Sequence, residues 1–196
     1  MSDRRALRQA LRAARAALPA EERSSASKSI ARRIAATRWL GPGRRIALYA
    51  ALAEELDTAP LLALARQRGC EVYFPRLEPG LARRMSFSPV GPRRRLNRYG
   101  ILEPDTTARL SAAALQLIFL PLVGFDASGH RLGMGAGFYD RALQFRRRRR
   151  HWRGPLLVGL GYACQELAAL EPIATDIPLD VVVTERGIRF FRGEIE

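Results

Sequence analysis

The segment from Leu117 to Leu143 reads LIFLPLVGFDASGHRLGMGAGFYDRAL and joins three patterns in one stretch. Its first four residues, Leu117–Leu120, are all apolar, which is typical of a strand buried on both faces of a parallel sheet. A loop with four glycines in nine residues follows, and Phe138–Phe145 then predicts a helix. A buried strand, a glycine loop and a helix in this order indicate an α/β protein whose ligand site lies at the end of the strand.

Short apolar runs alternate with helical patterns on both sides of this segment. Pro60–Arg68 predicts a helix that Asp57 or Thr58 can cap, and a further helix is expected around Leu110–Leu115. The other strands are predicted at Ile46–Ala50, Val72–Phe74 (ended by Pro75), Met85–Ser88, Leu156–Leu160, Val181–Thr184 and Ile188–Phe191. We therefore expect a single α/β domain over residues 1–196, a three-layer α/β/α sandwich with a largely parallel mixed sheet.

Two helices are predicted to precede this sheet. Ser2 and Asp3 can cap the first helix, and its apolar positions have helical spacing up to Pro19. Glu21 and Glu22 favour the start of a second helix, which we expect to end near Trp39.

The chain has a net charge of +14, and 32 of its 33 basic residues are arginine. The run Arg146–Arg150 could contact a phosphate backbone, but it is also typical of a solvated helix end and loop. We favour the second interpretation, because no aromatic RNA-binding motif or helix-turn-helix pattern accompanies the run. We therefore expect no nucleic-acid partner, and RNA binding through Arg146–Arg150 remains the alternative from another functional class.

The remaining composition excludes several classes of protein. Cys70 and Cys164 form no CxxC pair, and His130 and His151 lack metal-ligand spacing, so neither a disulfide framework nor a zinc site is expected. No apolar run approaches the roughly 20 residues that span a bilayer, and the first residues lack the apolar core of a secretory signal. We expect a cytoplasmic protein without a membrane association or an obligate protein partner.

The glycine loop itself allows two interpretations. Glycine lets backbone N–H groups approach an anion closely, but a glycine-rich turn without a ligand is equally compatible with the spacing. The loop lacks the GK[ST] ending of a phosphate-binding Walker A loop and the GxGxxG spacing of a dinucleotide-binding fold. Arg131 before the glycines and Asp140 after them favour a site for phosphate and Mg²⁺.

The loop and its surroundings resemble the signature of the 5-formyltetrahydrofolate cyclo-ligase family, also called 5,10-methenyltetrahydrofolate synthetases. The resemblance is strongest over PLVGFDASGHRLGMGAGFYDRAL, and weaker similarities follow the family's order along the chain. These are RRALR (Arg4–Arg8), ALAEELDT (Ala51–Thr58), YGILEP (Tyr99–Pro104), GYACQ (Gly161–Gln165) and DIPLDVVVTERG (Asp176–Gly187). The resemblance implies an ATP- and Mg²⁺-dependent ligase that converts 5-formyltetrahydrofolate to 5,10-methenyltetrahydrofolate and releases ADP and phosphate.

The resemblance also implies site residues. Asp140 would hold Mg²⁺, with Asp180 as a second carboxylate on the metal side. Glu55 would bind the pterin edge, Leu52 and Tyr139 would line the folate pocket, and Tyr99 would lie near the substrate. Arg131, Tyr139 and Asp140 would be the catalytic residues. ATP would be bound by Arg4, Arg8, Arg131, Leu132, Gly133, Met134, Gly135, Ala136, Gly137, Phe138 and Tyr139.

Three positions depart from the family pattern. Arg4 replaces a lysine that is frequent at this position, which keeps the charge but changes its geometry. Met134 and Ala136 lie where some members have arginine and lysine, so the remaining charge on the phosphates must be neutralised by other groups. The altered loop leaves a second enzyme hypothesis open, in which a related ATP-dependent protein acts on a different substrate.

Overall fold

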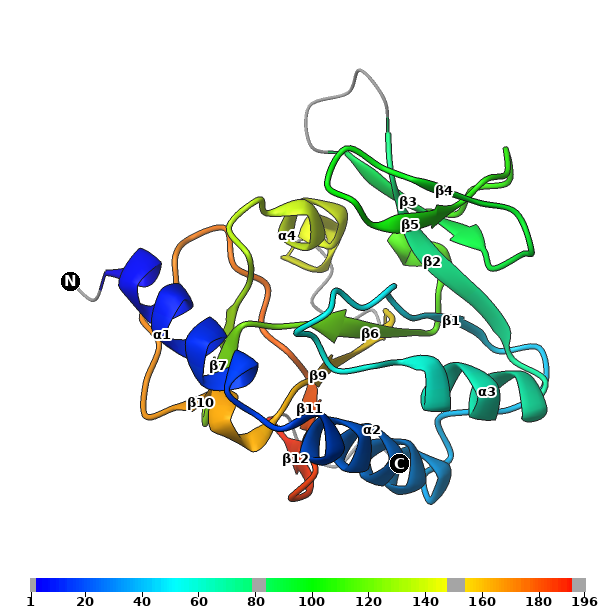
Figure 1. Cartoon of the computed structure of the whole chain (residues 1–196). Coiled ribbons are helices and arrows are strands. Elements are labelled where there is room, and N and C mark those ends of the chain that lie inside the picture. Colours follow the sequence, from blue (N-terminus) through cyan, green and yellow to red (C-terminus); the bar gives the residue numbers. More distant parts are fainter. Residues whose placement is uncertain (1–2, 79–83, 148–153, 192–196) are drawn as a thin grey trace.

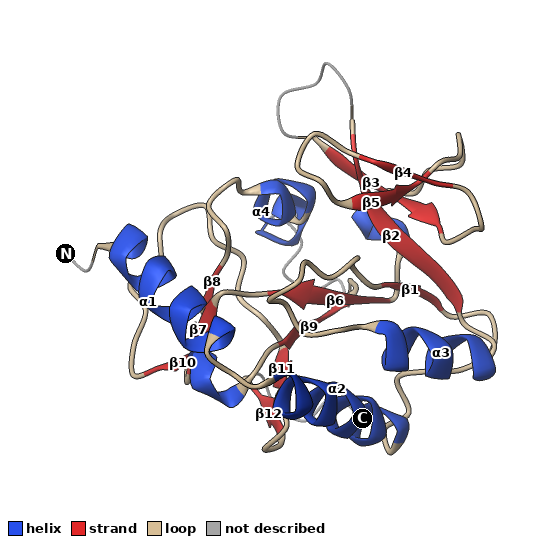
Figure 2. Ribbon diagram, in the orientation of Figure 1, coloured by secondary structure: helices blue, strands red, loops and turns tan. Residues whose placement is uncertain are grey.

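The computed structural model describes residues 3–78, 84–147 and 154–191. Its centre is a seven-stranded sheet with the order β12-β11-β9-β6-β1-β2-β3 (Figures 1 and 2). The five inner strands are parallel, and each edge strand is antiparallel to its neighbour. The strands are β1 (Arg45–Ala47), β2 (Glu71–Leu77), β3 (Met85–Pro89), β6 (Leu117–Pro121), β9 (Leu156–Leu160), β11 (Val181–Val183) and β12 (Ile188–Phe190). The predicted α/β class with a largely parallel mixed sheet is confirmed.

Helices cover both faces of this sheet. The longer helices α2 (Ala20–Ala35) and α3 (Ala59–Gln67) pack on one face. The short α4 (Phe138–Ala142) and the 3₁₀ helix η2 (Gln144–Arg147) pack on the other face, and together they replace the single helix predicted over Phe138–Phe145. Figure 1 shows this layered arrangement.

The helix α1 (Arg4–Ala16) lies beside a small three-stranded sheet and not on the main sheet (Figure 1). The small sheet consists of β7 (Gly124–Asp126), β8 (Arg131–Leu132) and β10 (Glu166–Leu167). The predicted cap of α1 is confirmed, because the Asp3 side chain accepts a hydrogen bond from the Arg5 backbone N–H at 2.8 Å. Pro19 precedes α2 as its N-cap, and α2 ends at Ala35, earlier than predicted.

The apolar run at Leu117 forms β6 in the middle of the sheet, as predicted, and its first four side chains are at most 2% exposed. Leu117 and Phe119 belong to the core cluster under α2 and α3. Ile118 and Leu120 belong to the cluster on the opposite face. This alternation is what a strand covered on both faces requires.

The prediction that Pro75 ends its strand is wrong, because β2 continues through Pro75 to Leu77. A proline interrupts a β-sheet where a carbonyl oxygen of the neighbouring strand would otherwise accept a hydrogen bond from that position, because proline has no backbone N–H. On one side β1 has already ended at Ala47, and on the other side the paired residue Phe87 bonds instead to Leu110. Pro75 therefore lies beyond the pairing with β1 and opposite a residue whose backbone bonds go to Leu110.

Two other segments differ from the predictions. The helix expected around Leu110–Leu115 is only a 3₁₀ turn, η1 (Ala112–Ala114). Residues 94–104, for which no strands were predicted, form an antiparallel hairpin of β4 (Arg94–Leu96) and β5 (Leu102–Pro104). A further 3₁₀ turn, η3 (Ala163–Gln165), follows β9.

The basic run Arg146–Arg150 is only partly visible, since Arg148–Arg150 lie outside the described residues. Within the described part, Arg146 donates hydrogen bonds from both terminal nitrogens to Asp180, at 2.8 and 2.9 Å. Arg147 donates to the Asp176 carbonyl oxygen. Among the described helices, none combines the length and the apolar character needed to cross a membrane.

Candidate functional site

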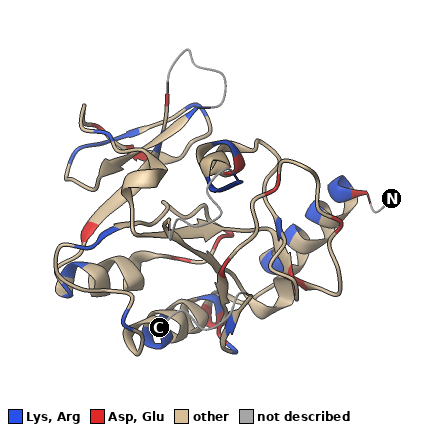
Figure 3. Ribbon diagram, turned by 180° about the vertical axis from the view of Figure 1, so that it is seen from behind, with Lys and Arg blue, Asp and Glu red and all other residues tan. Residues whose placement is uncertain are grey.

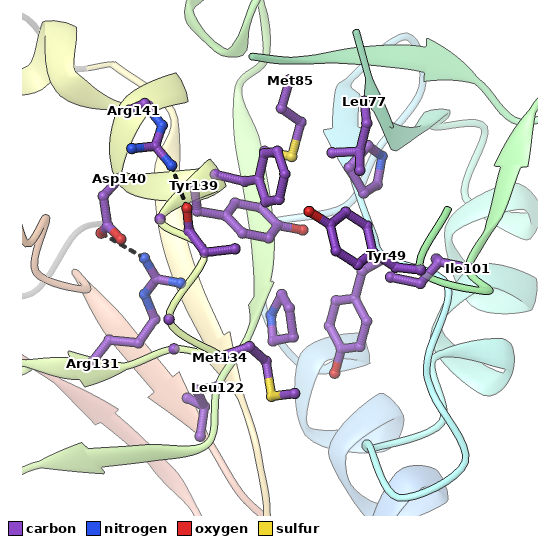
Figure 4. Close-up of a pocket in the computed structure, with 18 of the residues that line it drawn as sticks. Tyr49, Leu77, Met85, Ile101, Leu122, Arg131, Met134, Tyr139, Asp140 and Arg141 are labelled. Carbon is purple, nitrogen blue, oxygen red and sulfur yellow. Dashed lines mark hydrogen bonds and ion pairs between the residues drawn. The ribbon is translucent and has the colours of Figure 1, made fainter. Parts of the chain in front are cut away.

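A cavity of about 640 Å³ opens at the carboxyl ends of β1, β2 and β6. Parallel strands bring these ends to one edge of the sheet, which is where open α/β folds bind ligands. The glycine loop, α1, α4 and the β4–β5 hairpin complete its walls. Figure 4 shows Arg131, Asp140 and Arg141 on one side of the cavity, and Tyr49, Leu77 and Ile101 on the other side.

The glycine loop runs from Gly133 to Gly137 along the cavity, between β8 and α4. Gly135 and Gly137 have φ angles of +98° and +67°, which favour glycine because a Cβ atom would be strained there. Within the described part of the chain, no backbone N–H from Gly133 to Gly137 donates to another protein group. Such amides can bind the oxygens of an anion.

Two arginines of α1 extend from this helix to the cavity. The Arg8 Nε donates to the Gly133 carbonyl oxygen at 2.8 Å, which fixes the start of the glycine loop. Arg4 Nη1 donates to Asp176 Oδ2 at 3.0 Å. Figure 3 shows basic residues along α1, so this helix brings positive charge to one end of the site.

Arg131 is the most deeply buried of the cavity arginines, with a side chain that is 5% exposed. Its Nη2 lies 2.8 Å from Asp140 Oδ1, and its guanidinium lies 5.6 Å from the centre of the Tyr139 ring. The Nε atoms of Arg131 and Arg4 are buried and lack a hydrogen-bond partner among the described residues. Arg15, Arg33 and Arg76 also have a buried Nε without a partner in the described part of the chain, although they do not line the cavity. Of these described arginines, only Arg4 and Arg131 lie at the cavity, where an anionic ligand could supply the missing acceptor.

The two carboxylates Asp140 and Asp176 line the cavity on this side. Asp140 accepts from Arg131 and from the Ile177 N–H through the same oxygen, Oδ1. Asp176 accepts from Arg4 and from the Ile173 N–H through its Oδ2 alone. Each carboxylate can therefore offer its second oxygen to a cation without losing these bonds.

Asp180 lies elsewhere, although the sequence suggested it as a metal-side carboxylate. It does not line the cavity, and its two oxygens accept from Arg146 and from the Leu157 N–H. These contacts join η2 and β9 to the start of β11, so Asp180 stabilises the packing of these elements. Of the two aspartates in this segment, Asp176, four residues before Asp180, is the one that lines the cavity.

Glu55 and Leu52 lie in the short connection between β1 and α3. Glu55 Oε2 accepts from the Leu52 N–H at 3.0 Å, and the Glu55 N–H donates to the Leu52 carbonyl oxygen at 2.8 Å. Burial raises the pKa of the Glu55 carboxyl above its ordinary value, against the lowering effect of its hydrogen bond to Leu52. The site therefore contains a buried acid beside apolar side chains.

Two tyrosines from different elements extend into the cavity (Figure 4). Burial raises the pKa of both the Tyr49 and Tyr139 phenols well above the usual range, although Arg131 opposes this effect at Tyr139. Both phenols therefore keep their protons at neutral pH. The Tyr49 hydroxyl donates to the Leu56 carbonyl oxygen at 3.3 Å, and the Tyr139 hydroxyl can donate to a ligand. Together with Met85, Leu77 and Ile101, they form a wall suited to a flat, partly apolar ligand.

Tyr99 lies at the tip of the β4–β5 hairpin and lines the mouth of the cavity. Its side chain is 50% exposed, and its ring meets Phe138 edge-on, with 6.0 Å between the ring centres. Phe138 is the first residue of α4. The contact therefore joins the hairpin to the end of the glycine loop.

The structure thus brings most of the predicted site residues together. Leu132 and Asp180 are the exceptions, since Leu132 is fully buried with Leu11 and Val123 behind the loop. The cavity is also lined by Tyr49, which falls within the strand predicted at Ile46–Ala50, and by Asp176, neither of which was predicted as a site residue. The predicted residues that line the cavity are Arg4, Arg8, Leu52, Glu55, Tyr99, Arg131, Gly133, Met134, Gly135, Ala136, Gly137, Phe138, Tyr139 and Asp140.

Comparison with known proteins places these features in a family. The model of the "5-formyltetrahydrofolate cyclo-ligase family" matches residues 1–185. The chain is 36% identical to the 5-formyltetrahydrofolate cyclo-ligase of Escherichia coli K12 over 180 residues, which cover 89% of this chain and 96% of that protein. It is 34% identical to the Haemophilus influenzae enzyme over 188 residues, which cover 92% and 97%.

A solved structure supports the same assignment. The NMR structure of Aquifex aeolicus 5,10-methenyltetrahydrofolate synthetase superimposes with a TM-score of 0.81 and is 30% identical in sequence. The match covers 98% of this chain and 95% of that chain. The chain belongs to the 5-formyltetrahydrofolate cyclo-ligase family.

Proposed function

We propose that the chain uses ATP and Mg²⁺ to convert 5-formyltetrahydrofolate to 5,10-methenyltetrahydrofolate, with release of ADP and phosphate. The observation that carries this proposal is the division of the cavity into two sides. One side has a glycine loop with unused amides and several arginines. The other has tyrosines, apolar side chains and the two acids Glu55 and Glu103, which suit a pterin.

The ATP phosphates would lie along the glycine loop. The N–H groups of Gly133 to Gly137 would donate to phosphate oxygens, and the buried Nε of Arg131 would find its acceptor there. Met134 and Ala136 add no charge to the loop, so Arg4 and Arg8 from α1 supply it in this chain. Arg141, whose guanidinium donates to the Ala136 carbonyl oxygen, adds a further charge beside the loop.

Mg²⁺ would be held by Asp140 and Asp176 together with the phosphates. The described residues contain no cluster of three or more acids, histidines and cysteines that would enclose a metal. That fits Mg²⁺ bound to a nucleotide, which keeps several waters and takes one or two carboxylates from the protein. The ion supplies neutralisation of the phosphate charge, and Arg131 and Arg4 hold the two carboxylates in place.

The folate would occupy the opposite side of the cavity. A pterin edge offers N–H donors, and Glu55, one of the two acids on this side, would accept from them. Leu52 and Tyr139 would enclose the ring, and Tyr99 would cover it at the cavity mouth. In this arrangement the formyl group would face the phosphates.

The chemistry needs alignment more than a protein nucleophile. The oxygen of an N-formyl group is a poor leaving group, so N10 of the folate cannot displace it directly. Transfer of the γ-phosphoryl group to this oxygen releases ADP and activates the carbon. N10 then attacks that carbon and loses its proton, the carbon–oxygen bond breaks, and phosphate leaves with the oxygen. The fixed arginines and loop amides stabilise the charge on the transferred group.

A coupled assay tests the proposal. The purified protein should form the methenyl product, followed by its absorbance, and release one ADP for each product. Omission of ATP, or removal of Mg²⁺ with a chelator, should abolish product formation. ATP turnover that proceeds without 5-formyltetrahydrofolate and yields no methenyl product would instead support the related enzyme with a different substrate.

A further inference from the structure

The β4–β5 hairpin has little structure of its own to fix its tip. Each strand has three residues, and an isolated two-stranded hairpin is marginally stable at best. Nevertheless, its tip residue Tyr99 meets Phe138 across the mouth of the cavity. The orientation of Tyr99 therefore depends on contacts that hold the hairpin to the rest of the molecule.

Asn97 organises the turn at this tip. Its side-chain Oδ1 accepts hydrogen bonds from the backbone N–H groups of Tyr99, at 2.8 Å, and Ile101, at 3.1 Å. Gly100 completes the turn with a φ angle of +74°. Backbone hydrogen bonds from the Asn97 N–H to the Ile101 carbonyl oxygen and from the Gly100 N–H to the Asn97 carbonyl oxygen also close the turn, and the Asn97 side chain adds the bond that holds the Tyr99 N–H.

Glu103 connects this turn to the main sheet. Its Oε1 accepts from Asn97 Nδ2 at 2.8 Å and from the Leu77 backbone N–H at 2.9 Å. Leu77 is the last residue of β2, so one oxygen atom joins the hairpin tip to the end of a core strand. Glu103 is only 2% exposed, and burying a polar group is costly unless it is hydrogen-bonded.

We propose that Glu103 is a positioning residue for the folate substrate, acting through Asn97 on Tyr99. Glu103 lies at the cavity wall, but its hydrogen bonds point to the hairpin turn and to β2. It sets where the Tyr99 ring lies over the substrate and against Phe138. The inference rests on the proposed function, since it assigns Tyr99 to the folate side.

The test compares steady-state kinetics of the wild type, Glu103→Ala and Glu103→Gln. Loss of the shared acceptor in Glu103→Ala should raise the folate KM by about tenfold and change the ATP KM by less than about twofold. Glu103→Gln keeps a carbonyl oxygen for both donors and should restore the folate KM to within about threefold of the wild type. Glu166→Ala, which removes a surface carboxylate paired with Arg189, is the matched control.

The double variant Glu103→Ala/Tyr99→Ala separates positioning from a general loss of structure. If Glu103 acts through Tyr99, its removal has no further effect on the folate KM once the ring is absent. An equal rise in both backgrounds, or equal changes in the folate and ATP KM values, would overturn the inference. If Glu103→Ala does not fold, Asn97→Ala replaces it as the test variant. Asn97→Ala leaves the Glu103–Leu77 bond intact and should raise the folate KM by a similar factor. A wild type that forms no methenyl product overturns the proposed function as well, whereas failure of this inference leaves wild-type activity intact.

Discussion

Arg131 Nη2 and Asp140 Oδ1 lie 2.8 Å apart in the wall of the cavity, nine residues apart in sequence on β8 and α4. The pair connects the two ends of the glycine loop. It also holds the Asp140 carboxylate through one oxygen, which leaves its second oxygen for a cation.

Asp140→Asn should therefore impair catalysis much more than folding. The amide keeps an oxygen for Arg131 but removes the negative charge that a bound Mg²⁺ requires. We expect kcat to fall by about 100-fold or more, with a rise in the Mg²⁺ concentration needed for half-maximal activity. Kinetics at several Mg²⁺ concentrations measure this. Near-normal catalysis by a correctly folded variant would remove Asp140 from the metal site.

Arg8→Ala should weaken ATP binding selectively. The variant loses the bond from Arg8 Nε to the Gly133 carbonyl oxygen and a positive charge beside the phosphates. We expect the ATP KM to rise by about tenfold or more, with little change in the folate KM. Arg5→Ala is the control, because Arg5 lies on the same helix but does not line the cavity. Similar effects of both variants would indicate only a general effect of charge.

Glu55→Gln should make the protein more stable and less active. Burial raises the pKa of Glu55 in the folded state, so the native protein binds the proton more tightly than the unfolded chain does. The contribution of this group to stability is therefore favourable at low pH and is lost as pH rises above the ordinary glutamate pKa of about 4.3.

An uncharged glutamine avoids this loss, so Tm at pH 7 should exceed that of the wild type and the two values should converge toward pH 4. The folate KM should rise, because an amide is a weaker acceptor for the pterin N–H groups than a carboxylate. Thermal unfolding at several pH values and steady-state kinetics measure both effects. A Tm of Glu55→Gln below that of the wild type at pH 7 would contradict the raised pKa of Glu55.

Tyr99→Ala should raise the folate KM by about tenfold and the ATP KM by much less, since the ring is assigned to the folate side and touches the end of the glycine loop only at Phe138. Tyr99→Phe keeps the edge-on contact with Phe138 and should remain close to the wild type. Equal effects of Tyr99→Ala on both KM values would contradict its assigned place.

Asp180→Ala should destabilise the fold without changing the metal requirement. The variant leaves the guanidinium of Arg146 without its buried carboxylate, which costs about 3–5 kcal/mol in the free energy of unfolding. Glu166→Ala breaks a surface pair and should cost less than about 1 kcal/mol. Denaturant unfolding gives both values. A higher Mg²⁺ requirement in the folded Asp180→Ala protein would place this acid at the metal after all.

The sequence was most informative where local pattern and tertiary environment agree. The strands at Leu117 and Leu156 were predicted within one residue, because their apolar runs are buried on both faces. The end of the strand at Pro75 was predicted wrongly, since a proline is tolerated within a strand where neighbouring strands do not accept a hydrogen bond from its position. That condition depends on where β1 ends and how Phe87 pairs, which local sequence does not contain.

Most of the candidate site could be named from family motifs, but the choice between two acids could not. Asp176 and Asp180 both lie in the motif DIPLD, and either one could face a ligand. The difference arises from partners far away in sequence. Arg4, 172 residues earlier, draws Asp176 to the cavity, while Arg146 holds Asp180 at the start of β11, away from the cavity.

The position of α1 has a consequence for the order in which the protein becomes active during synthesis. This helix leaves the ribosome before the strands of both sheets, yet its Arg8 needs Gly133, 125 residues later, and its Arg4 needs Asp176. The folate side draws largely on residues 49–103, which emerge much earlier. The proposed phosphate side is therefore incomplete until Asp176 has been made, and the protein can become catalytically competent only after that point.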